Sequence, residues 1–374
     1  MKITFTVTND LSFDQRMQRI CSSLSNAGHE VILIGRKRKN SLALRGEEYE
    51  QHRLSLIFDK GFLFYSAYQI RLFFYLLFHS QGIISAVDLD TILPCLLVAK
   101  LKGQPIIFDA HEYFSEVPEV VNRTFVKKVW EKVASVCIPK VNKCYTVGDS
   151  LARIFEEKYG QKFETIRNVP FAEKSSSGQP SKVKKSVILY QGMLNQGRGL
   201  PQIISAMQEI EGAILWLVGE GDLSAQLREQ VTEEKLSEKV KFLGFIPPDK
   251  LAATTQQAYI GINLLENSGL SYYYSLANKT FDYIQAGIPS VQMDFPEYRA
   301  LQNQYQPFYL IPDLTTESIT KAINNLLMDE ALYLRLKNNC LSARKELNWE
   351  KEEAKLLEIY AYFDDYRSLI GLVE

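Results

Sequence analysis

The feature that most constrains this chain is a strand–helix alternation that runs along it twice. The first series opens with the apolar strand KITFTV (2–7), the helix DQRMQRICSSLSNAG (14–28) and the strand EVILIG (30–35). Further strands are predicted at GIISAV (82–87), PIIFDA (105–110) and KCYTV (143–147). Because strands separated by helices are joined by crossover connections, this pattern predicts a parallel sheet with helices on both faces.

A second series of the same kind follows. Its predicted strands are SVILYQG (186–192), AILWLVGEG (213–221), KVKFLGF (239–245), YIGINLL (259–265), IPSVQM (288–293) and FYLI (308–311). The intervening AEKSSSGQPSKVKK (172–185) has no apolar periodicity and predicts an interdomain linker. The chain of 374 residues also exceeds one ordinary hydrophobic core.

We therefore predict an α/β protein built from two doubly wound, Rossmann-like domains. Residues 1–170 form the first domain and residues 171–350 form the second, while a C-terminal helix at about 351–374 packs back on the first. Such sheets bind ligands beyond the carboxyl ends of their strands. Two facing sheets would place an interdomain cleft there, which is a favoured position for a ligand site.

Composition favours a cytoplasmic protein with reduced thiols. The first ten residues, MKITFTVTND, lack the apolar stretch of a signal peptide. The five cysteines form no C-x-x-C pair and mostly have apolar neighbours: Cys21, Cys95, Cys137, Cys144 and Cys340. Residues 1–170 carry 23 Lys and Arg against 18 Asp and Glu, and the remainder carries 20 against 26. The basic first half fits an anionic membrane face or a phosphate-bearing acceptor, or ordinary scatter of solvated charge; no nucleic-acid partner is expected.

One apolar segment needs separate interpretation. FLFYSAYQIRLFFYLLF (62–78) is strongly aromatic, but it is short for a spanning helix and holds Gln69 and Arg71 near its middle. Two interpretations stay open: a helix buried against the sheet, and a helix that also touches a bilayer surface. The second would place the protein peripherally at the inner face of the membrane.

The turn after the first strand of the second series is rich in glycine. In QGMLNQGRGLPQ (191–202), Gly192, Gly197 and Gly199 surround Arg198 just before a predicted helix. Backbone N–H groups of such a turn can approach an anion, and arginine suits a diphosphate. LVGEGD (217–222), with Gly219, and LGFIPPDKL (243–251), with Gly244, are similar turns. Each can also serve backbone geometry alone, but together they favour a nucleotide site.

The stretch SLANKTFDYIQAGIPSV (275–291) predicts a helix that ends at Gly287 and leads into a buried strand. Lys279 in its first turn would add positive charge to the helix-start N–H groups, and Asp282 could accept hydrogen bonds from sugar hydroxyls. The alternative is a surface Lys–Asp pair at i,i+3. The spacing alone favours neither interpretation.

These passages together resemble family 4 glycosyltransferases, the bacterial group 1 type. NKTFDYIQAGIPSV (278–291) resembles the nucleotide-sugar signature, and YQGMLNQGRGLPQIISAM (190–207) resembles the phosphate loop. The turns LVGEGDL and VKFLGFIPPDKL also resemble those of the family. So do DQRMQRICSSLSNAGHEV, VDLDTILP and DAHEYF in the first half.

The resemblance implies a GT-B fold and a metal-independent hexosyltransferase that retains configuration. The substrate would be a UDP- or GDP-sugar, with no separate cofactor, and the acceptor a glycan or lipid-linked molecule in cell-surface polysaccharide or glycoconjugate synthesis. Arg198 matches the diphosphate-binding residue, Asp282 the ribose-binding acid, and Lys279 the helix start. The loop NSGLSYYYS (267–275) matches the segment that approaches the donor sugar. The other donor-binding positions would be Gly192, Gly197, Gly199, Gly219, Gly244, Ser275 and Asn278.

The first half would then supply the acceptor side. His111 could contact the transferred sugar or the acceptor, or satisfy loop carbonyls. The other acceptor-side candidates are Asp14, Arg16, Asp88, Asp90, Asp109 and Glu112. Asp14 and Arg16 could instead cap and pair at a helix start. For Asp88 and Asp90 we expect capping or acceptor binding rather than a metal site, because the phosphate-type loop lies in the other domain.

Three positions depart from the family pattern. Met193 and Tyr274 stand where the family commonly has arginine and glutamate, and Asp282 is one methylene shorter than the usual glutamate. Two alternative functions stay open at this point: a GT-B nucleotide-sugar epimerase, and a catalytically silent GT-B subunit that binds a partner glycosyltransferase.

Overall fold

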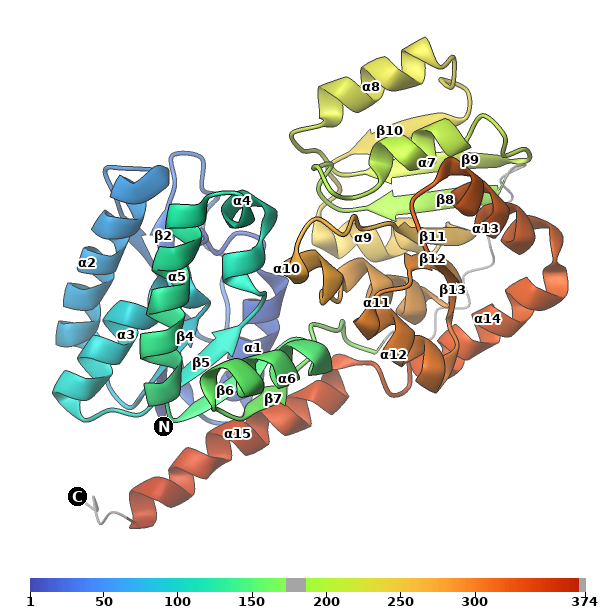
Figure 1. Cartoon of the computed structure of the whole chain (residues 1–374). Coiled ribbons are helices and arrows are strands. Elements are labelled where there is room, and N and C mark those ends of the chain that lie inside the picture. Colours follow the sequence, from blue (N-terminus) through green and yellow to red (C-terminus); the bar gives the residue numbers. More distant parts are fainter. Residues whose placement is uncertain (173–185, 370–374) are drawn as a thin grey trace. The chain divides into compact units, whose positions relative to one another are not determined.

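The computed structural model describes residues 1–172 and 186–369, and the chain divides into two compact units (Figure 1). The first unit comprises residues 1–168 and 352–374, and the second comprises residues 169–351. Apart from Ala172, the predicted linker 172–185 lies outside the described residues, as does the end of the predicted C-terminal helix, 370–374.

The first unit is built on a parallel sheet in the order β3-β2-β1-β4-β5-β6-β7. Its strands are β1 (Lys2–Thr6), β2 (Glu30–Lys37), β3 (Glu50–Ser55), β4 (Ile83–Val87), β5 (Ile106–Ala110), β6 (Lys143–Thr146) and β7 (Phe163–Thr165). The strand order reverses between β1 and β4, and the carboxyl ends on either side of such a reversal leave room for a ligand. The inner strands β4 and β5 are buried along their whole length, as expected for a sheet covered on both faces.

Helices cover this sheet. They are α1 (Gln15–Asn26), α2 (Gly61–His79), α3 (Leu89–Lys102), α4 (Pro118–Val121), α5 (Thr124–Cys137), α6 (Asp149–Tyr159) and the greater part of α15 (Trp349–Leu369), with short 3-10 turns η1 (Phe114–Glu116) and η2 (Ile138–Lys140). α15 joins the first unit through a buried polar contact, in which the Tyr360 hydroxyl donates to Ser85 Oγ at 3.1 Å. Glu352 near its start accepts from the backbone N–H of Arg167 at 3.0 Å.

α2 is half-buried. Phe64, Tyr68, Leu72 and Leu76 recur every fourth residue and are fully packed inside the unit, whereas Phe78 on the opposite side is 75% exposed. The expectation of a buried helix therefore holds for one face only. Among the described residues, α2 is the one helix long and apolar enough to cross a membrane, a test that a core helix can also pass.

The second unit repeats the plan with a parallel sheet in the order β10-β9-β8-β11-β12-β13. Its strands are β8 (Ser186–Gln191), β9 (Ala213–Val218), β10 (Val240–Gly244), β11 (Ile260–Asn263), β12 (Ser290–Met293) and β13 (Phe308–Ile311). Its helices are α7 (Leu200–Ala206), α8 (Ser224–Glu233), α9 (Pro248–Thr255), α10 (Leu270–Tyr273), α11 (Asn278–Ala286), α12 (Pro296–Tyr305), α13 (Thr316–Met328) and α14 (Glu330–Ala343). Here the order reverses between β8 and β11.

The structure adds two strands to those predicted from the sequence. β3, with the sequence EQHRLS, is an edge strand with only Leu54 buried, so it lacks the apolar run of its neighbours. β7 has three residues, too few for a period-2 pattern to show. The predicted helix at 275–286 begins three residues later, at Asn278, and ends at Gly287 in the left-handed conformation.

Candidate functional site

Three loops at the carboxyl ends of β8, β9 and β10 are joined by backbone hydrogen bonds. Gly192 N donates to Val218 O at 2.9 Å, and Gly219 N donates to Gly244 O at 2.8 Å. Gly219 has φ +127°, and a Cβ there would lie 2.0 Å from the carbonyl oxygen of Gly192. Because only glycine allows this approach, the loops form one continuous surface beyond the strands.

The glycine-rich turn is also fixed against β11. Gly199 has φ +60°, and a Cβ there would lie 2.6 Å from the Leu264 carbonyl oxygen. Gly197 O accepts from Glu266 N at 2.9 Å, so both sides of the turn are tied to the segment that follows β11. The packing of these loops therefore explains why glycine is required at Gly199 and Gly219. The contact of the predicted glycines with a ligand stays a prediction.

α11 is placed above the β8–β11 boundary by Tyr283. The buried Tyr283 hydroxyl lies 3.0 Å from Leu189 O and 3.2 Å from Ile262 O, one on each strand. A Cβ on Gly261 would lie 2.4 Å from the Tyr283 ring, so this glycine in β11 makes room for the helix. α11 has no side-chain N-cap and no acid in its first turn, which leaves positive potential at its start.

Lys279 in that first turn is buried, with an exposed fraction of 7%. Its Nζ has no hydrogen-bond partner in the described part of the chain and lies 4.3 Å from the Tyr190 ring centroid. Burial, and next the charge of Arg198, lower the pKa of Lys279 well below its usual value, while Asp282 opposes the shift. The interpretation of Lys279 as one half of a surface Lys–Asp pair is therefore wrong: it is a buried amine without a hydrogen-bonded counter-charge.

Arg198 adds a second cation to the same surface. Its Cζ lies 5.7 Å from the Tyr272 ring centroid, and its buried Nε has no hydrogen-bond partner among the described residues. Burial raises the pKa of Tyr190 to about 12, and Arg198 counteracts that rise. Since Tyr190 interacts with both cations, Arg198 and Lys279 converge on one place.

Asp282 is oriented by a hydrogen-bonded chain. Gln191 Nε2 donates to Asp282 Oδ2 at 2.7 Å, and the Thr255 hydroxyl donates to Gln191 Oε1 at 2.7 Å. The chain runs from the end of β8 to α9 and holds the half-buried carboxylate one turn below Lys279. An acid held in this way can accept hydrogen bonds from a polar ligand.

The remaining donor-side candidates lie around the start of α11. Ser275 Oγ donates to the Tyr272 carbonyl oxygen at 2.8 Å, which stabilises the turn after α10. Asn278 is exposed at the first position of α11. Of the departures from the family pattern, Met193 is exposed and Tyr274 ends α10.

In the first unit, Asp109 at the end of β5 contacts two of the predicted acceptor-side residues. Arg16 Nη2 donates to Asp109 Oδ1 at 2.9 Å, and His111 Nε2 lies 2.9 Å from Asp109 Oδ2. Burial alone would lower the pKa of His111, but the carboxylates of Asp109 and Asp88 outweigh it and raise the pKa to about 9. Burial would raise the pKa of Asp109, yet Arg16 and His111 hold it below the usual value. His111 is thus a protonated imidazole at neutral pH, paired with carboxylates rather than with loop carbonyls.

Asp88 does not cap α3, so the capping expectation for this residue is wrong. Its side chain makes no cap hydrogen bond; instead Oδ1 accepts from the backbone N–H of His111 at 2.9 Å. Its φ of +58° with ψ 168° is strained for a residue with a side chain. Strain of this kind concentrates at functional sites, so the observation favours the acceptor-side interpretation.

Asp90 and Asp14 are held by neighbouring groups. The Thr8 hydroxyl donates to Asp90 Oδ2 at 2.6 Å, and burial raises the pKa of Asp90 to about 6. Asp14 caps α1 by accepting from Met17 N at 3.0 Å, as predicted, and Glu112 is exposed. Within residues 1–172 and 186–369, no group of three or more His, Cys, Asp or Glu is arranged to hold a metal ion. Contact of these residues with an acceptor stays a prediction.

The comparison with protein families decides what the second unit is. Residues 171–342 match the family described as "Glycosyl transferases group 1". The second unit is therefore similar to a group 1 glycosyltransferase domain. The predicted resemblance to this family is therefore confirmed, and the matched range includes the loop around Arg198 and the helix with Lys279 and Asp282. A search of curated proteins finds no significant match.

Solved structures extend the likeness in fold to the whole chain. Sucrose-phosphate synthase from Thermosynechococcus elongatus has a TM-score of 0.78 at 16% identity, over 98% of this chain and 100% of that one. HepE from Anabaena, in complex with UDP and glucose, has a TM-score of 0.77 at 15% identity, over 96% and 99%. WaaG, a glycosyltransferase involved in lipopolysaccharide biosynthesis, has a TM-score of 0.75 at 13% identity, over 96% and 99%. The fold is GT-B, as predicted.

Sequence reasoning missed several residues of the second unit that position the predicted ones. Tyr190 and Tyr272 contact the two cations, and Gln191 orients Asp282. Tyr190 and Gln191 are the last two residues of β8, and that place at a strand end is a signal that could have drawn attention to them. Tyr272 lies in α10 within a run of three consecutive tyrosines, where the sequence does not distinguish one from another.

Proposed function

We propose that this protein is a retaining glycosyltransferase that moves a sugar from a nucleoside diphosphate donor to a glycan or lipid-linked acceptor. The observation that carries the proposal is the buried Lys279 amine, which has no hydrogen-bond partner in the described residues and lies beside Arg198 at the start of α11. Burial without an anion disfavours the charged form of this amine, which is why its pKa is lowered. A bound diphosphate supplies that anion.

The proposed chemistry needs these cations. The anomeric carbon of the sugar exchanges its bond to a diphosphate oxygen for a bond to the acceptor oxygen, and the acceptor hydroxyl releases its proton. The electron pair of the broken bond stays on the diphosphate, so negative charge grows there in the transition state. Arg198, Lys279 and the start of α11 are placed to stabilise that charge, which lets the reaction proceed without a metal ion.

Asp282 is the proposed partner of the donor's ribose. Gln191 holds one carboxylate oxygen at 2.7 Å and thereby fixes the direction of the group. HepE has been solved with UDP and with UDP-glucose. UDP-sugars are therefore the donor class to test first and GDP-sugars the second.

The first unit is the proposed acceptor side. His111 carries a positive charge at neutral pH because of Asp109 and Asp88, so it can donate a hydrogen bond to a sugar or acceptor oxygen. Asp90 and the strained Asp88 offer carboxyl groups to hydroxyl groups, and burial raises the pKa of Asp88 to about 8. We further propose that the acceptor belongs to cell-surface polysaccharide or glycoconjugate synthesis and that the enzyme works in the cytoplasm.

The experiment is a thermal-shift screen with UDP, GDP, ADP and their sugars, followed by transfer assays with the donor that binds. Arg198→Ala should lower turnover on the order of 10²–10³-fold, by analogy with removal of one oxyanion donor. Arg335→Ala, at an exposed position of α14, is the matched control and should leave turnover unchanged. Full turnover of Arg198→Ala would overturn the assignment of this loop.

The same experiment separates the alternatives. An epimerase would convert the donor into a different nucleotide sugar when no acceptor is present. A catalytically silent subunit would show no stabilisation by any nucleotide. Either result would replace the proposed function.

A further inference from the structure

A group of exposed apolar side chains lies on three helices of the first unit. α2, α3 and α5 lie side by side on one face of the sheet (Figure 1). Their outward positions include Phe62, Phe74 and Phe78 on α2, Leu101 on α3 and Phe125 on α5, with exposed fractions from 52% to 82%. A contiguous group of large exposed apolar side chains marks an interaction surface. We call it the α2–α3–α5 face.

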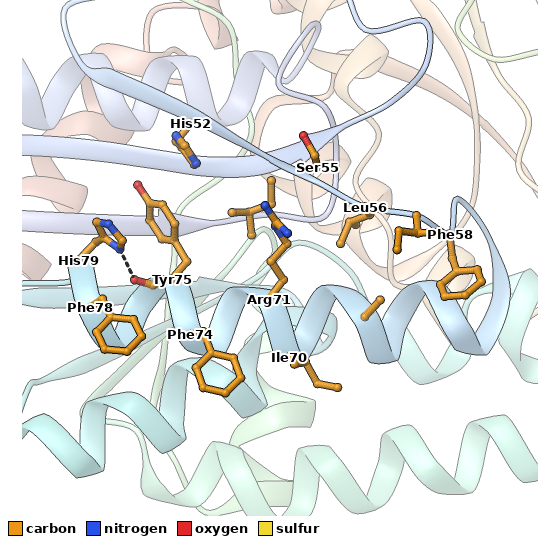
Figure 2. Close-up of a pocket in the computed structure, with 13 residues that line it drawn as sticks. His52, Ser55, Leu56, Phe58, Ile70, Arg71, Phe74, Tyr75, Phe78 and His79 are labelled. Atoms are coloured by element: carbon orange, nitrogen blue, oxygen red, sulfur yellow. Dashed lines mark hydrogen bonds between the residues drawn. The ribbon is translucent and has the colours of Figure 1, made fainter.

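α2 presents two different sides at this face. Figure 2 shows Ile70, Phe74 and Phe78 on the outer side of the helix, pointing away from β3, whereas Tyr75 points toward His52 on β3. Between the helix and the strand lies a groove of about 570 Å³ with mostly apolar walls. The Phe74 ring contacts that of Phe73, and Ile70, Phe74 and Phe78 also border the groove, so the groove and the outer side of α2 form one apolar surface.

The charge around this face is strongly positive. The basic residues of the three helices are Arg71, Lys100, Lys102, Lys127, Lys128 and Lys132. Within the described residues, these three helices carry two acidic residues, the buried Asp90 and Glu131. Lys127 is paired with Glu116, which leaves most of the positive charge uncompensated. Phenylalanine and leucine beside lysine and arginine are the composition of a surface that enters the headgroup region of an anionic bilayer.

We propose that the α2–α3–α5 face docks on an anionic lipid bilayer, with its aromatic ridge in the interface and its basic residues against the headgroups. A second copy of this chain fits the face less well, because a two-fold contact would bring the two basic surfaces together. A spanning role for α2 does not fit either. Phe64, Tyr68, Leu72 and Leu76 are packed against the unit, and spanning would strip them from it. This proposal is independent of the glycosyltransferase chemistry.

The test is co-sedimentation of the full chain with vesicles of phosphatidylcholine mixed with phosphatidylglycerol, at increasing salt. Binding should be strong at low salt, fall as salt rises, and be much weaker with vesicles of phosphatidylcholine alone. The charge variant Lys100→Glu, Lys128→Glu, Lys132→Glu should bind at least about tenfold more weakly. The apolar variant Phe74→Ser, Phe78→Ser should lose the part of the binding that resists salt. All five positions are exposed, so both variants should melt close to the parent.

A matched control carries Lys321→Glu and Leu334→Ser, exposed positions of the second unit, and should bind as the parent does. The proposal is overturned if the parent ignores phosphatidylglycerol vesicles at low salt, or if it binds neutral vesicles equally well. It is also overturned if light scattering shows a dimer that the apolar variant converts to a monomer, because the face would then be a contact between copies. The thermal-shift screen with nucleotides tests the proposed function independently of the vesicle assay. Failure of the membrane proposal would therefore not contradict the proposed function.

Discussion

Replacement of Lys279 by methionine should make the protein more stable and its nucleotide binding weaker. Methionine keeps an unbranched apolar stem and removes the amine, which is buried beside Tyr190 without a hydrogen-bond partner among the described residues. An unsatisfied buried donor costs about 1–3 kcal/mol, so the free energy of unfolding should rise by that order. For a unit of this size, each kcal/mol corresponds to roughly 2–4 °C in Tm.

The loss of affinity follows from the same amine. A hydrogen bond to a charged group contributes about 1.5–3 kcal/mol, so the Kd for UDP, or for the nucleotide that binds, should rise roughly 10- to 150-fold. Differential scanning fluorimetry gives the first quantity and titration calorimetry the second. Lys321→Met, at an exposed position of α13, is the control and should change neither.

The pH dependence of stability gives a second measure of the same substitution. The folded-state pKa of Lys279 is lowered from 10.5, so between the lowered value and 10.5 the unfolded state binds more protons. The contribution of this residue to stability must therefore rise with pH through that window, and Lys279→Met should remove the rise. A nearby diphosphate restores the pKa, so nucleotide binding in that window should take up a proton in the parent only.

The reasoning is refuted if Lys279→Met melts at a lower temperature than the parent and binds nucleotide with unchanged affinity. Lys279 would then be a structural residue whose burial stabilises α11 against β8. The site would have to be sought elsewhere on the loops.

The remaining predictions concern the other charges and one glycine. The pKa of His111 is raised from 6.5 to about 9, so the stability that it contributes is full below pH 6.5 and is lost as pH rises through 9. In urea unfolding measured over this pH range, His111→Gln should reduce the pH dependence of the free energy of unfolding. An unchanged pH dependence would exclude the His111 network as its source. Gly219→Ala should lower the free energy of unfolding by at least about 2 kcal/mol more than Gly212→Ala does. Gly212 also has positive φ, but nothing lies within 4 Å of a Cβ added there. Equal losses of stability in thermal unfolding would show that the close approach to Gly192 does not matter. Asp282→Asn should weaken donor and free nucleotide alike with little further effect on kcat, since ribose contacts change little along the reaction; a selective loss of kcat would assign Asp282 a different role. Turnover should survive EDTA, and a loss restored by manganese would contradict charge stabilisation by protein cations alone.

The sequence by itself determined the local elements and the class of fold. Apolar strands alternating with helices leave few solutions other than two parallel sheets. The strands from 186 to 311 appear at the predicted places, and β8, β11 and β12 are buried along almost their whole length, which explains their continuous apolar runs. The end of α11 at Gly287 was predictable because C-capping by glycine is a local property, whereas the start of the helix lies at Asn278, three residues later than predicted. The family resemblance then pointed to Arg198, Lys279 and Asp282 as one set.

What only the tertiary structure decided was the environment of those residues. Spacing along a helix cannot show whether Lys279 pairs with Asp282 or lies buried against Tyr190, because Tyr190 comes from a strand far away in the chain. The same holds for Asp88, which lies at a helix start and yet accepts from His111 N instead of capping. It also holds for α2, since composition describes an apolar helix and only the packing of its Phe64 row against the sheet leaves Phe74 and Phe78 outside. Burial and long-range partners set charge state and exposure, and neither is a property of local sequence.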